Sequence, residues 1–226
     1  MGPPAGRPAR SLPLSAARAH SQLRRRPGGG RTAVRVEPWR SARRIKVNPD
    51  APQRPVREAA LRRGITVFVP TPRLRAGFKK LDPARIPDDQ IRAAASLSQG
   101  ARFGEEMLLE ALPAMDAIVC GSVAVTRDGR RCGKGEGYSD LEYAILRELG
   151  HPPVPVATTV HPVQIVRRLP RDPTDLPLSL IVTPHEVVRV PAPPPAPAGI
   201  DWARLSEADL AAMPVLRELA QTKRAG

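Results

Sequence analysis

Short apolar runs alternate with stretches of helical spacing through the middle of the chain. Four runs have the length and composition of buried strands, namely 65–70, 116–125, 154–161 and 178–190. Four other stretches have the spacing or composition of helices, namely 54–63, 87–100, 104–115 and 138–150. Strands that alternate with helices predict an α/β fold, in which helices cover both faces of a mostly parallel sheet.

The two ends of the chain differ in composition from this central domain, 45–190. Residues 1–44 are rich in Arg, Pro, Gly and Ser and show neither the apolar period of a helix nor that of a strand, so we expect a basic, disordered leader. Its composition fits inert disorder, an RNA-contacting arm or a targeting signal. The segment 191–226 begins with a stiff proline-rich linker. It continues into a helix that the pair Ser206 and Asp209 caps, and we expect this tail to pack on the domain.

The net charge of +14 is concentrated in the leader. Residues 1–50 contain 12 Lys and Arg against two acids, whereas the rest of the chain contains 24 against 20. Aromatic residues make up only 3% of the chain, which leaves few platforms for stacking bases. A nucleic acid partner is therefore not expected, except through the leader.

The chain carries no sign of a membrane span or of a disulfide framework. No stretch approaches the roughly 20 apolar residues that a spanning helix needs. The two cysteines, Cys120 and Cys132, are too few for a disulfide-stapled domain and fit a reducing compartment. We expect a cytoplasmic monomer.

The stretch CGKGEGYSDLEY, 132–143, lies between a predicted strand and a predicted helix. Three glycines alternate there, at Gly133, Gly135 and Gly137. Glycine permits the positive φ angles that aim successive N–H groups at one anion, and the following helix adds its positive end. The spacing matches neither the dinucleotide fingerprint nor the phosphate-loop motif, so a phosphate site and a flexible turn both remain open.

Charged residues beside these glycines extend the possible chemistry. Lys134 can supply a mobile positive charge, and Arg130 and Arg131 add two more. Asp140 falls in the first turn of the predicted helix. It could hold Mg²⁺ through water or simply stabilise the helix dipole.

The sequence RRCGKGEGYSD resembles the ATP-loop signature of the 5-formyltetrahydrofolate cyclo-ligases (methenyltetrahydrofolate synthetases). That signature runs Arg-x-Gly-x-Gly-x-Gly-Tyr-Tyr-Asp. Six residues match it: Arg131, Gly133, Gly135, Gly137, Tyr138 and Asp140. Ser139 stands in place of the second Tyr. Neighbouring stretches, in order over 45–190, look like the branch of methenyltetrahydrofolate-synthetase-domain proteins.

The resemblance implies a three-layer, Rossmann-like α/β fold and a defined reaction. ATP phosphorylates the formyl oxygen of 5-formyltetrahydrofolate, and N10 then displaces phosphate to give 5,10-methenyltetrahydrofolate. The implied catalytic residues are Lys134 and Arg131. The implied ATP-binding residues are Arg131, Gly133, Lys134, Gly135, Glu136, Gly137, Tyr138 and Asp140. Mg²⁺ would be held by Asp140.

Two parts of the family pattern are altered in this chain. The leader has no convincing counterpart of the family's basic N-terminal helix, whose cations reach ATP. Near the family's folate-facing Glu, the chain offers Asp50 and Gln53, and a Gln can hydrogen-bond a pterin without a full charge. We predict Gln53, Arg73 and Phe78 as substrate-binding residues. The alternative is a non-catalytic relative that binds folate, nucleotide or RNA.

Overall fold

The computed structural model describes residues 32–135 and 137–225. Its main sheet has eight strands. They are β1 Arg44–Val47, β2 Thr66–Pro70, β3 Phe78–Leu81, β4 Glu105–Met107, β5 Ala117–Cys120, β8 Val156–Thr159, β9 Leu180–Val182 and β10 Val187–Arg189. Their order across the sheet is β10-β9-β8-β5-β1-β2-β3-β4. Strands β9, β8, β5, β1 and β2 run parallel, and β3, β4 and β10 complete the edges in antiparallel fashion.

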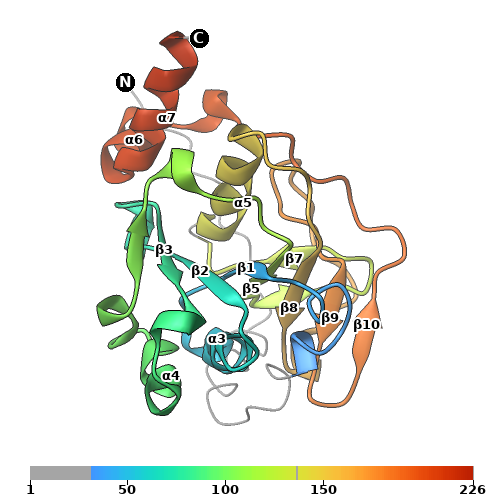
Figure 1. The fold of residues 1–226 in the computed structure, drawn as a ribbon. Coiled ribbons are helices and arrows are strands. Elements are labelled where there is room, and N and C mark those ends of the chain that lie inside the picture. The colour runs from blue at the N-terminus through green and yellow to red at the C-terminus, as the bar shows by residue number, and fades with distance from the viewer. Residues whose placement is uncertain (1–31, 136, 226) are drawn as a thin grey trace.

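Helices cover both faces of this sheet (Figure 1). On one face lie α3 Arg54–Leu61 and α4 Ile91–Ala94, and on the other lie α5 Tyr138–Glu148, α6 Glu207–Ala212 and α7 Pro214–Ala225. Alternate strand residues enter the two cores, so that Val119 packs on the α3 side whereas Ile118 and Cys120 pack on the α5 side. The predicted three-layer α/β fold with a mostly parallel sheet is confirmed.

Short elements connect these layers. A two-stranded ribbon, β6 Ala124–Val125 and β7 Arg131–Cys132, stands between β5 and α5. Single turns of 3₁₀ helix are η2 Ala51–Gln53, η3 Pro72–Leu74, η4 Pro83–Arg85, η5 Asp88–Gln90, η6 Gly100–Arg102, η7 Leu109–Ala111, η8 Pro162–Gln164 and η9 Trp202–Arg204.

The helix predicted over 104–115 is wrong. Its first residues form the edge strand β4, which pairs antiparallel with β3, and the rest is the turn η7 and irregular chain. The carboxylates of β4 face lysines of β3, with Glu106 3.5 Å from Lys79 and Glu105 3.9 Å from Lys80. These cross-strand pairs favour the strand, and Pro113 disfavours a continuous helix.

The predicted disorder of the leader is wrong for residues 32–43. Ala33, Val34, Trp39 and Ala42 are buried in the core on the α3 side. The indole Nε1 of Trp39 donates to the carbonyl of Ile118 in the central sheet at 3.0 Å. A single large aromatic among small residues has no periodicity, which is why the pattern did not reveal this docking. The prediction for residues 1–31 lies outside the described residues.

The C-terminal tail packs on the α5 side of the sheet, as predicted. The buried residues of this tail are Ile200, Met213, Val215, Leu216 and Leu219. The predicted cap is present, because the Asp209 N–H donates to Ser206 Oγ at 3.2 Å and the Ser206 N–H donates to Asp209 Oδ2 at 2.9 Å. The tail is therefore part of the core around α5.

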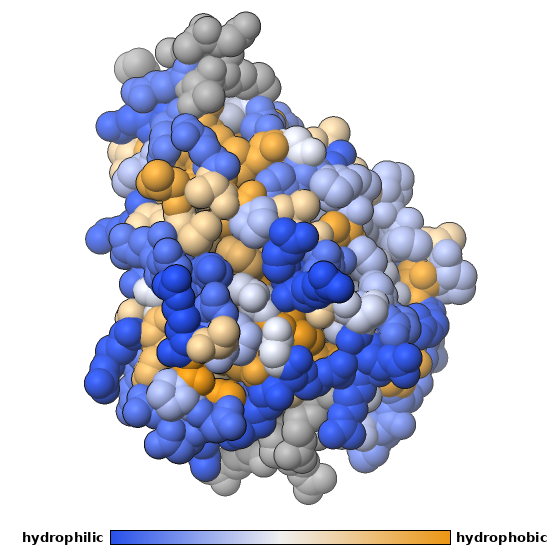
Figure 2. Space-filling view, viewed as in Figure 1, coloured by the Kyte–Doolittle hydropathy of each residue, from blue (hydrophilic) through white to orange (hydrophobic). Residues whose placement is uncertain are grey.

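The surface is mostly polar in the orientation of Figure 1, and apolar residues gather towards the C-terminal helices (Figure 2). Leu108, which follows β4, is the most exposed large apolar side chain of the described residues, at 72%. Among those residues, no helix combines the length and apolar character needed to cross a membrane. Cys120 and Cys132 are both buried and are not joined in a disulfide.

Candidate active site

Three parallel strands, β1, β5 and β8, deliver polar residues to one edge of the sheet. Ligands of open α/β sheets bind beyond the carboxyl ends of such strands. Asp50 and Gln53 follow β1, Gly121 follows β5, and Thr159 ends β8. Hydrogen bonds and close approaches connect these four residues, and the glycine stretch reaches the same place.

Gln53 is fully buried and has one side-chain oxygen without a partner. Its Nε2 donates to Thr159 Oγ1 at 3.3 Å, whereas its Oε1 has no hydrogen-bond donor within the described residues. A Cβ placed on Gly121 would lie 3.0 Å from Gln53 Oε1 and 3.1 Å from Asp50 Oδ2. Two acceptor oxygens therefore converge on the bare Cα of Gly121. A buried acceptor without a donor is costly, which marks this place as one where a ligand N–H would fit.

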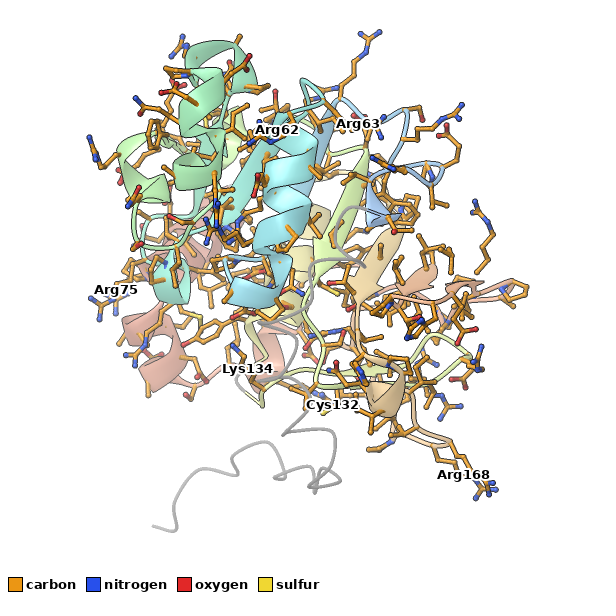
Figure 3. All side chains as sticks on the ribbon, turned by 90° about the horizontal axis from the view of Figure 1, so that it is seen from below. Arg62, Arg63, Arg75, Cys132, Lys134 and Arg168 are labelled. Carbon is orange, nitrogen blue, oxygen red and sulfur yellow. The ribbon has the colours of Figure 1, made fainter. Side chains whose placement is uncertain are left out.

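Lys134 connects the glycine stretch to the same acceptors. Its Nζ lies 2.6 Å from Asp50 Oδ1, and its side chain is 53% exposed. The ion pair is open to solvent and so contributes little to stability. Figure 3 shows Lys134 near Cys132, on the side of the molecule where β7 ends. Lys134 is therefore free to exchange Asp50 for another anion.

The glycine stretch has backbone angles that only glycine adopts without strain. Gly135 has φ +103°, and a Cβ there would meet nothing within 4 Å. Gly137 has φ +68° and caps α5 without any side-chain hydrogen bond. The stretch therefore presents open backbone beside the positive end of a helix, which is the geometry that phosphate binding requires.

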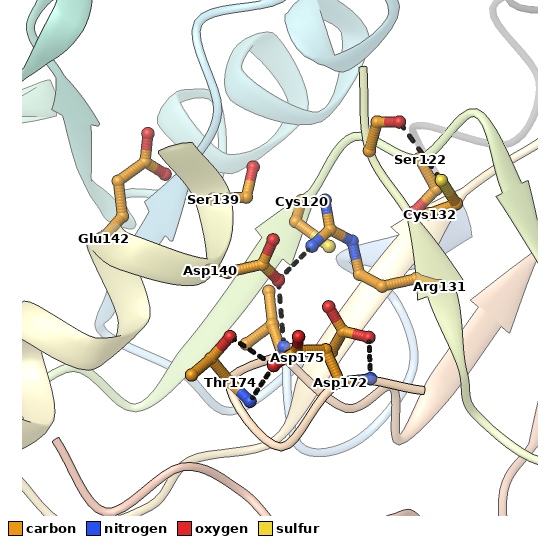
Figure 4. Close-up of polar contacts among 12 residues, drawn as sticks. Cys120, Ser122, Arg131, Cys132, Ser139, Asp140, Glu142, Asp172, Thr174 and Asp175 are labelled. Atoms are coloured by element: carbon orange, nitrogen blue, oxygen red, sulfur yellow. Dashed lines mark hydrogen bonds and ion pairs between the residues drawn. The ribbon is translucent and has the colours of Figure 1, made fainter. Parts of the chain in front are cut away.

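Arg131 and Asp140 form a buried ion pair beneath the loop (Figure 4). Arg131 Nη1 lies 2.6 Å from Asp140 Oδ1, and Arg131 Nη2 donates to the Gly121 carbonyl at 3.3 Å. The same Asp140 oxygen accepts the Leu176 N–H at 2.9 Å. Burial lowers the pKa of Arg131, but the adjacent Asp140 outweighs burial and the pKa is raised overall. This pair holds β7 to the first turn of α5.

The surroundings of Asp140 do not fit a Mg²⁺ ligand. Its Oδ1 already accepts two donors, and one of them is a guanidinium whose positive charge would repel a second cation. In the part of the chain that the structure describes, no group of three or more His, Cys, Asp and Glu could hold a metal ion.

A second buried pair, Lys46 with Glu142, connects β1 to α5. Lys46 Nζ hydrogen-bonds Glu142 and also donates to Asn48 Oδ1 at 3.0 Å. Asn48 Nδ2 donates to Ser139 Oγ at 2.8 Å. Burial raises the pKa of Glu142, and the charge of Lys46 only partly opposes this. The sequence analysis missed these residues, although a lysine inside the apolar strand IKV was a usable signal.

Arg57 fixes the segment that carries Asp50. It lies in α3 and donates to the carbonyls of Asn48, Asp50 and Ala95. Burial lowers the pKa of Arg57 to about 10, against the opposing charge of Asp50. An apolar pocket of about 180 Å³ adjoins Arg57. It is lined by Pro49, Arg57, Val69, Pro70, Thr71, Pro72, Lys79, Leu81, Ala94, Ser96, Leu97, Gly100 and Ala101.

Comparison with known proteins identifies the family. A family model described as the 5-formyltetrahydrofolate cyclo-ligase family matches residues 14–184. The chain belongs to the 5-formyltetrahydrofolate cyclo-ligase family. It is 42% identical over 196 residues to the mouse methenyltetrahydrofolate synthase domain-containing protein, covering 84% of this chain and 52% of that protein. The bovine protein of the same name is 40% identical over 210 residues, covering 88% and 55%.

The chain thus spans about half the length of these relatives of the cyclo-ligase family. The human protein of the same name is 38% identical over 190 residues, covering 80% of this chain and 49% of the protein. Among solved structures, the NMR structure of Aquifex aeolicus 5,10-methenyltetrahydrofolate synthetase matches with a TM-score of 0.48 and 18% identity. That match covers 79% of this chain and 94% of the other.

The structure divides the residues of the cyclo-ligase signature into two groups. Gly135 and Lys134 are exposed at the loop, and Gly133 and Tyr138 are partly buried beside it. Arg131 and Asp140 are internal, with 3% and 8% exposure. Glu136 lies outside the described residues. The predicted ATP contacts of all these residues remain predictions.

The three predicted substrate residues lie in different environments. Gln53 is at the site with Asp50 and Gly121. Arg73 is exposed in η3, beside Pro72 of the pocket wall, and has φ +53°. Phe78 is fully buried in the core on the α5 side, whereas its neighbour Lys79 lines the pocket. The structure therefore brings Gln53 to the site and does not bring Phe78 to this pocket.

Proposed function

We propose that this chain converts 5-formyltetrahydrofolate and ATP to 5,10-methenyltetrahydrofolate, ADP and phosphate. One observation carries the proposal. A buried acceptor without a donor, Gln53 Oε1, lies beside Asp50, and Asp50 is bound by the exposed lysine of the glycine loop. A ligand with N–H donors and a ligand with anionic phosphates would both be recognised at the carboxyl ends of β1 and β5.

In this proposal, the two substrates separate Lys134 from Asp50. The γ-phosphate of ATP would take Lys134, with the backbone of Gly133 and Gly135 beside it. The pterin ring of the folate has amino and ring N–H donors that suit Gln53 Oε1 and Asp50. The apolar pocket next to Arg57 would accept the aromatic part of the folate.

The chemistry needs positioning and charge neutralisation more than it needs acid–base groups. The formyl oxygen attacks the γ-phosphorus and ADP leaves. The folate N10 then attacks the activated formyl carbon, phosphate leaves from that carbon, and the N10 proton is lost to solvent. Lys134 would stabilise the charge that moves to the phosphate oxygens, and the folate and ATP sites would hold the reacting atoms together.

The assay is the growth of methenyl-folate absorbance after ATP is added. We expect turnover by the wild type and at least a tenfold loss for Lys134→Ala, because a charge-assisted contact to phosphate is worth about 1.5–3 kcal/mol. Lys80→Ala is the matched control, since Lys80 pairs with Asp82 at 3.2 Å on the far edge of the sheet. Absence of product with a full-length protein would reject the catalytic proposal.

A binding-only relative is the second candidate, and the internal position of Arg131 and Asp140 is equally consistent with it. Because that pair holds the fold together, the signature persists whether or not the reaction takes place. This candidate predicts calorimetric binding of ATP or folate without product. RNA binding through the leader also stays a prediction. Salt-sensitive RNA binding that persists after removal of residues 1–31, which leaves the docked segment 32–43 in place, would contradict it.

The described part of the chain has no single basic face in the view of Figure 3. Arg62 and Arg63 extend near α3, whereas Arg75 and Arg168 point outward on separate sides. This dispersal gives no reason to place RNA on the folded domain.

A further inference from the structure

The segment 200–204 of the C-terminal tail contacts the last turn of α5. Glu148 Oε2 accepts the Ile200 N–H at 3.0 Å, and Glu148 Oε1 accepts the indole N–H of Trp202 at 3.0 Å. A Cβ on Gly199 would meet Glu148 Oε2, so a side chain there would displace this carboxylate from its present position. The tail is thereby fixed to the end of α5 that lies farther from the glycine loop.

The same segment reaches the turn that precedes β9. Arg204 Nη1 lies 2.7 Å from both Asp172 oxygens. Asp172 Oδ1 also accepts the Thr174 N–H at 3.0 Å and the Thr174 hydroxyl at 2.8 Å. Burial raises the pKa of Asp172, but the hydrogen bonds from Arg204 and Thr174 outweigh burial and hold this pKa well below its usual range. Asp172 therefore stays ionised as the centre of this turn.

The turn 172–176 also contacts the N-terminal end of α5. The Asp172 N–H donates to Asp175 Oδ2 at 2.8 Å, which closes the turn on itself. The next residue, Leu176, donates its N–H to Asp140 Oδ1 at 2.9 Å (Figure 4). Gly137, the N-cap of α5, has no side chain that could fix the helix start. The contacts of Asp140 therefore supply the fixation that a capping side chain would otherwise give.

We propose that the tail segment 200–204 is a clamp that positions α5, and that Arg204 acts through the turn 172–176 on the start of this helix. Arg204 is a positioning residue, because it touches the loop only through other groups. The link to ATP rests on the proposed function, in which the glycine loop and the α5 start hold the phosphates. The link to the helix start rests on the contacts alone.

The variant Arg204→Ala tests the clamp, and Arg127→Ala is its matched control. Arg127 makes a comparable exposed ion pair, 2.7 Å from Glu186, next to the β9–β10 hairpin. Hydrogen exchange of the Leu176 amide reports the clamp without any ligand. We expect Arg204→Ala to raise this exchange rate by about 1.5- to fivefold, the range expected for an exposed ion pair, and Arg127→Ala to leave it unchanged. Arg204→Lys should restore part of the protection.

The ATP dissociation constant, measured by calorimetry, gives the functional arm. It should rise by a similar factor, about 1.5- to fivefold, in Arg204→Ala while the thermal midpoint shifts no more than in the control. Trp202→Phe, which loses only the indole donor, should raise exchange at the C-terminal turn of α5. Equal exchange at Leu176 in Arg204→Ala and Arg127→Ala would overturn the clamp. Failure of the wild type to bind ATP would reject the proposed function and leave the exchange result to decide the clamp.

Discussion

Replacement of Asp140 by Asn should destabilise the whole domain. We expect this loss of stability to be the primary effect, with any loss of catalysis following from it. The amide keeps an oxygen for the Leu176 N–H but removes the charge opposite Arg131. Arg131 is only 3% exposed, and its Nη1 lies 2.6 Å from the Asp140 carboxylate. The variant would therefore leave a guanidinium buried without its nearest counter-charge.

The expected magnitude is large compared with the stability of a typical domain. Breaking a buried ion pair by removing one partner costs about 3–5 kcal/mol. Domains of this size are stable by about 5–15 kcal/mol, so Asp140→Asn should remove a substantial part. The thermal midpoint should fall by about 6–20 °C, at about 2–4 °C per kcal/mol. The double variant Arg131→Met/Asp140→Asn removes both charges and should recover at least about 2 kcal/mol of the loss.

The assay is urea unfolding followed by the fluorescence of Trp39 and Trp202. The free energies of unfolding are compared between variants whose dependence on urea concentration (m value) is the same. A Mg²⁺ titration with ATP present completes it. If Asp140→Asn unfolded within about 1 kcal/mol of the wild type and yet lost Mg²⁺-dependent ATP binding, the carboxylate would be a metal ligand and the structural reasoning would be refuted. Lack of recovery in the double variant would also contradict the pairing.

Three further predictions test other parts of the structure. Gln53→Met removes an acceptor that has no donor and loses the long 3.3 Å donation to Thr159 Oγ1, so the free energy of unfolding in urea should change by no more than about 1 kcal/mol while folate affinity by calorimetry falls. Trp39→Ala should cost about 3–5 kcal/mol and Trp39→Phe clearly less, and equal thermal midpoints for Trp39→Ala and wild type would contradict the docking of residues 32–43. Burial raises the pKa of Glu142 above its ordinary value in an unfolded chain, so the folded state binds this proton more tightly than the unfolded chain does. The stability that this proton contributes is complete below that ordinary pKa and is lost as pH rises through the folded pKa. In urea titrations from low to neutral pH, the wild type should therefore lose stability relative to Glu142→Gln. A gain in stability over this pH range would contradict the prediction.

The layers of the fold could be predicted from the sequence because each buried helix or strand carries a recognisable pattern of apolar residues. The runs at 65–70 and 154–161 are mostly apolar, as is typical of strands covered on both faces, and each contains a strand of the sheet. The failure at 104–115 has a different cause. β4 is an edge strand whose partners are lysines of β3, so its identity depends on residues about 25 positions away and not on its own apolar spacing.

The candidate site was predictable only where a local motif marks it. The glycine spacing locates the loop, and Lys134 belongs to the same motif. The partners of the loop come from distant segments. Lys46 and Glu142 are 96 positions apart in sequence, and Lys134 and Asp50 are 84 apart. Such pairs depend on the strand order, which no period in a single sequence specifies.

The division of the signature into internal and exposed residues changes what the signature can establish. Loss of either Arg131 or Asp140 alone leaves the other charge buried and unpaired, so the folded loop depends on this pair whether or not a reaction takes place. Their presence therefore supports the fold of the loop more directly than it supports catalysis. The residues that can discriminate are Lys134, Asp50 and Gln53, since the fold gains little from a half-exposed ion pair and nothing from an acceptor without a donor. If a variant of these three residues leaves stability intact and abolishes turnover, the carboxyl end of β5 at Gly121 is the place where the cyclo-ligase chemistry occurs.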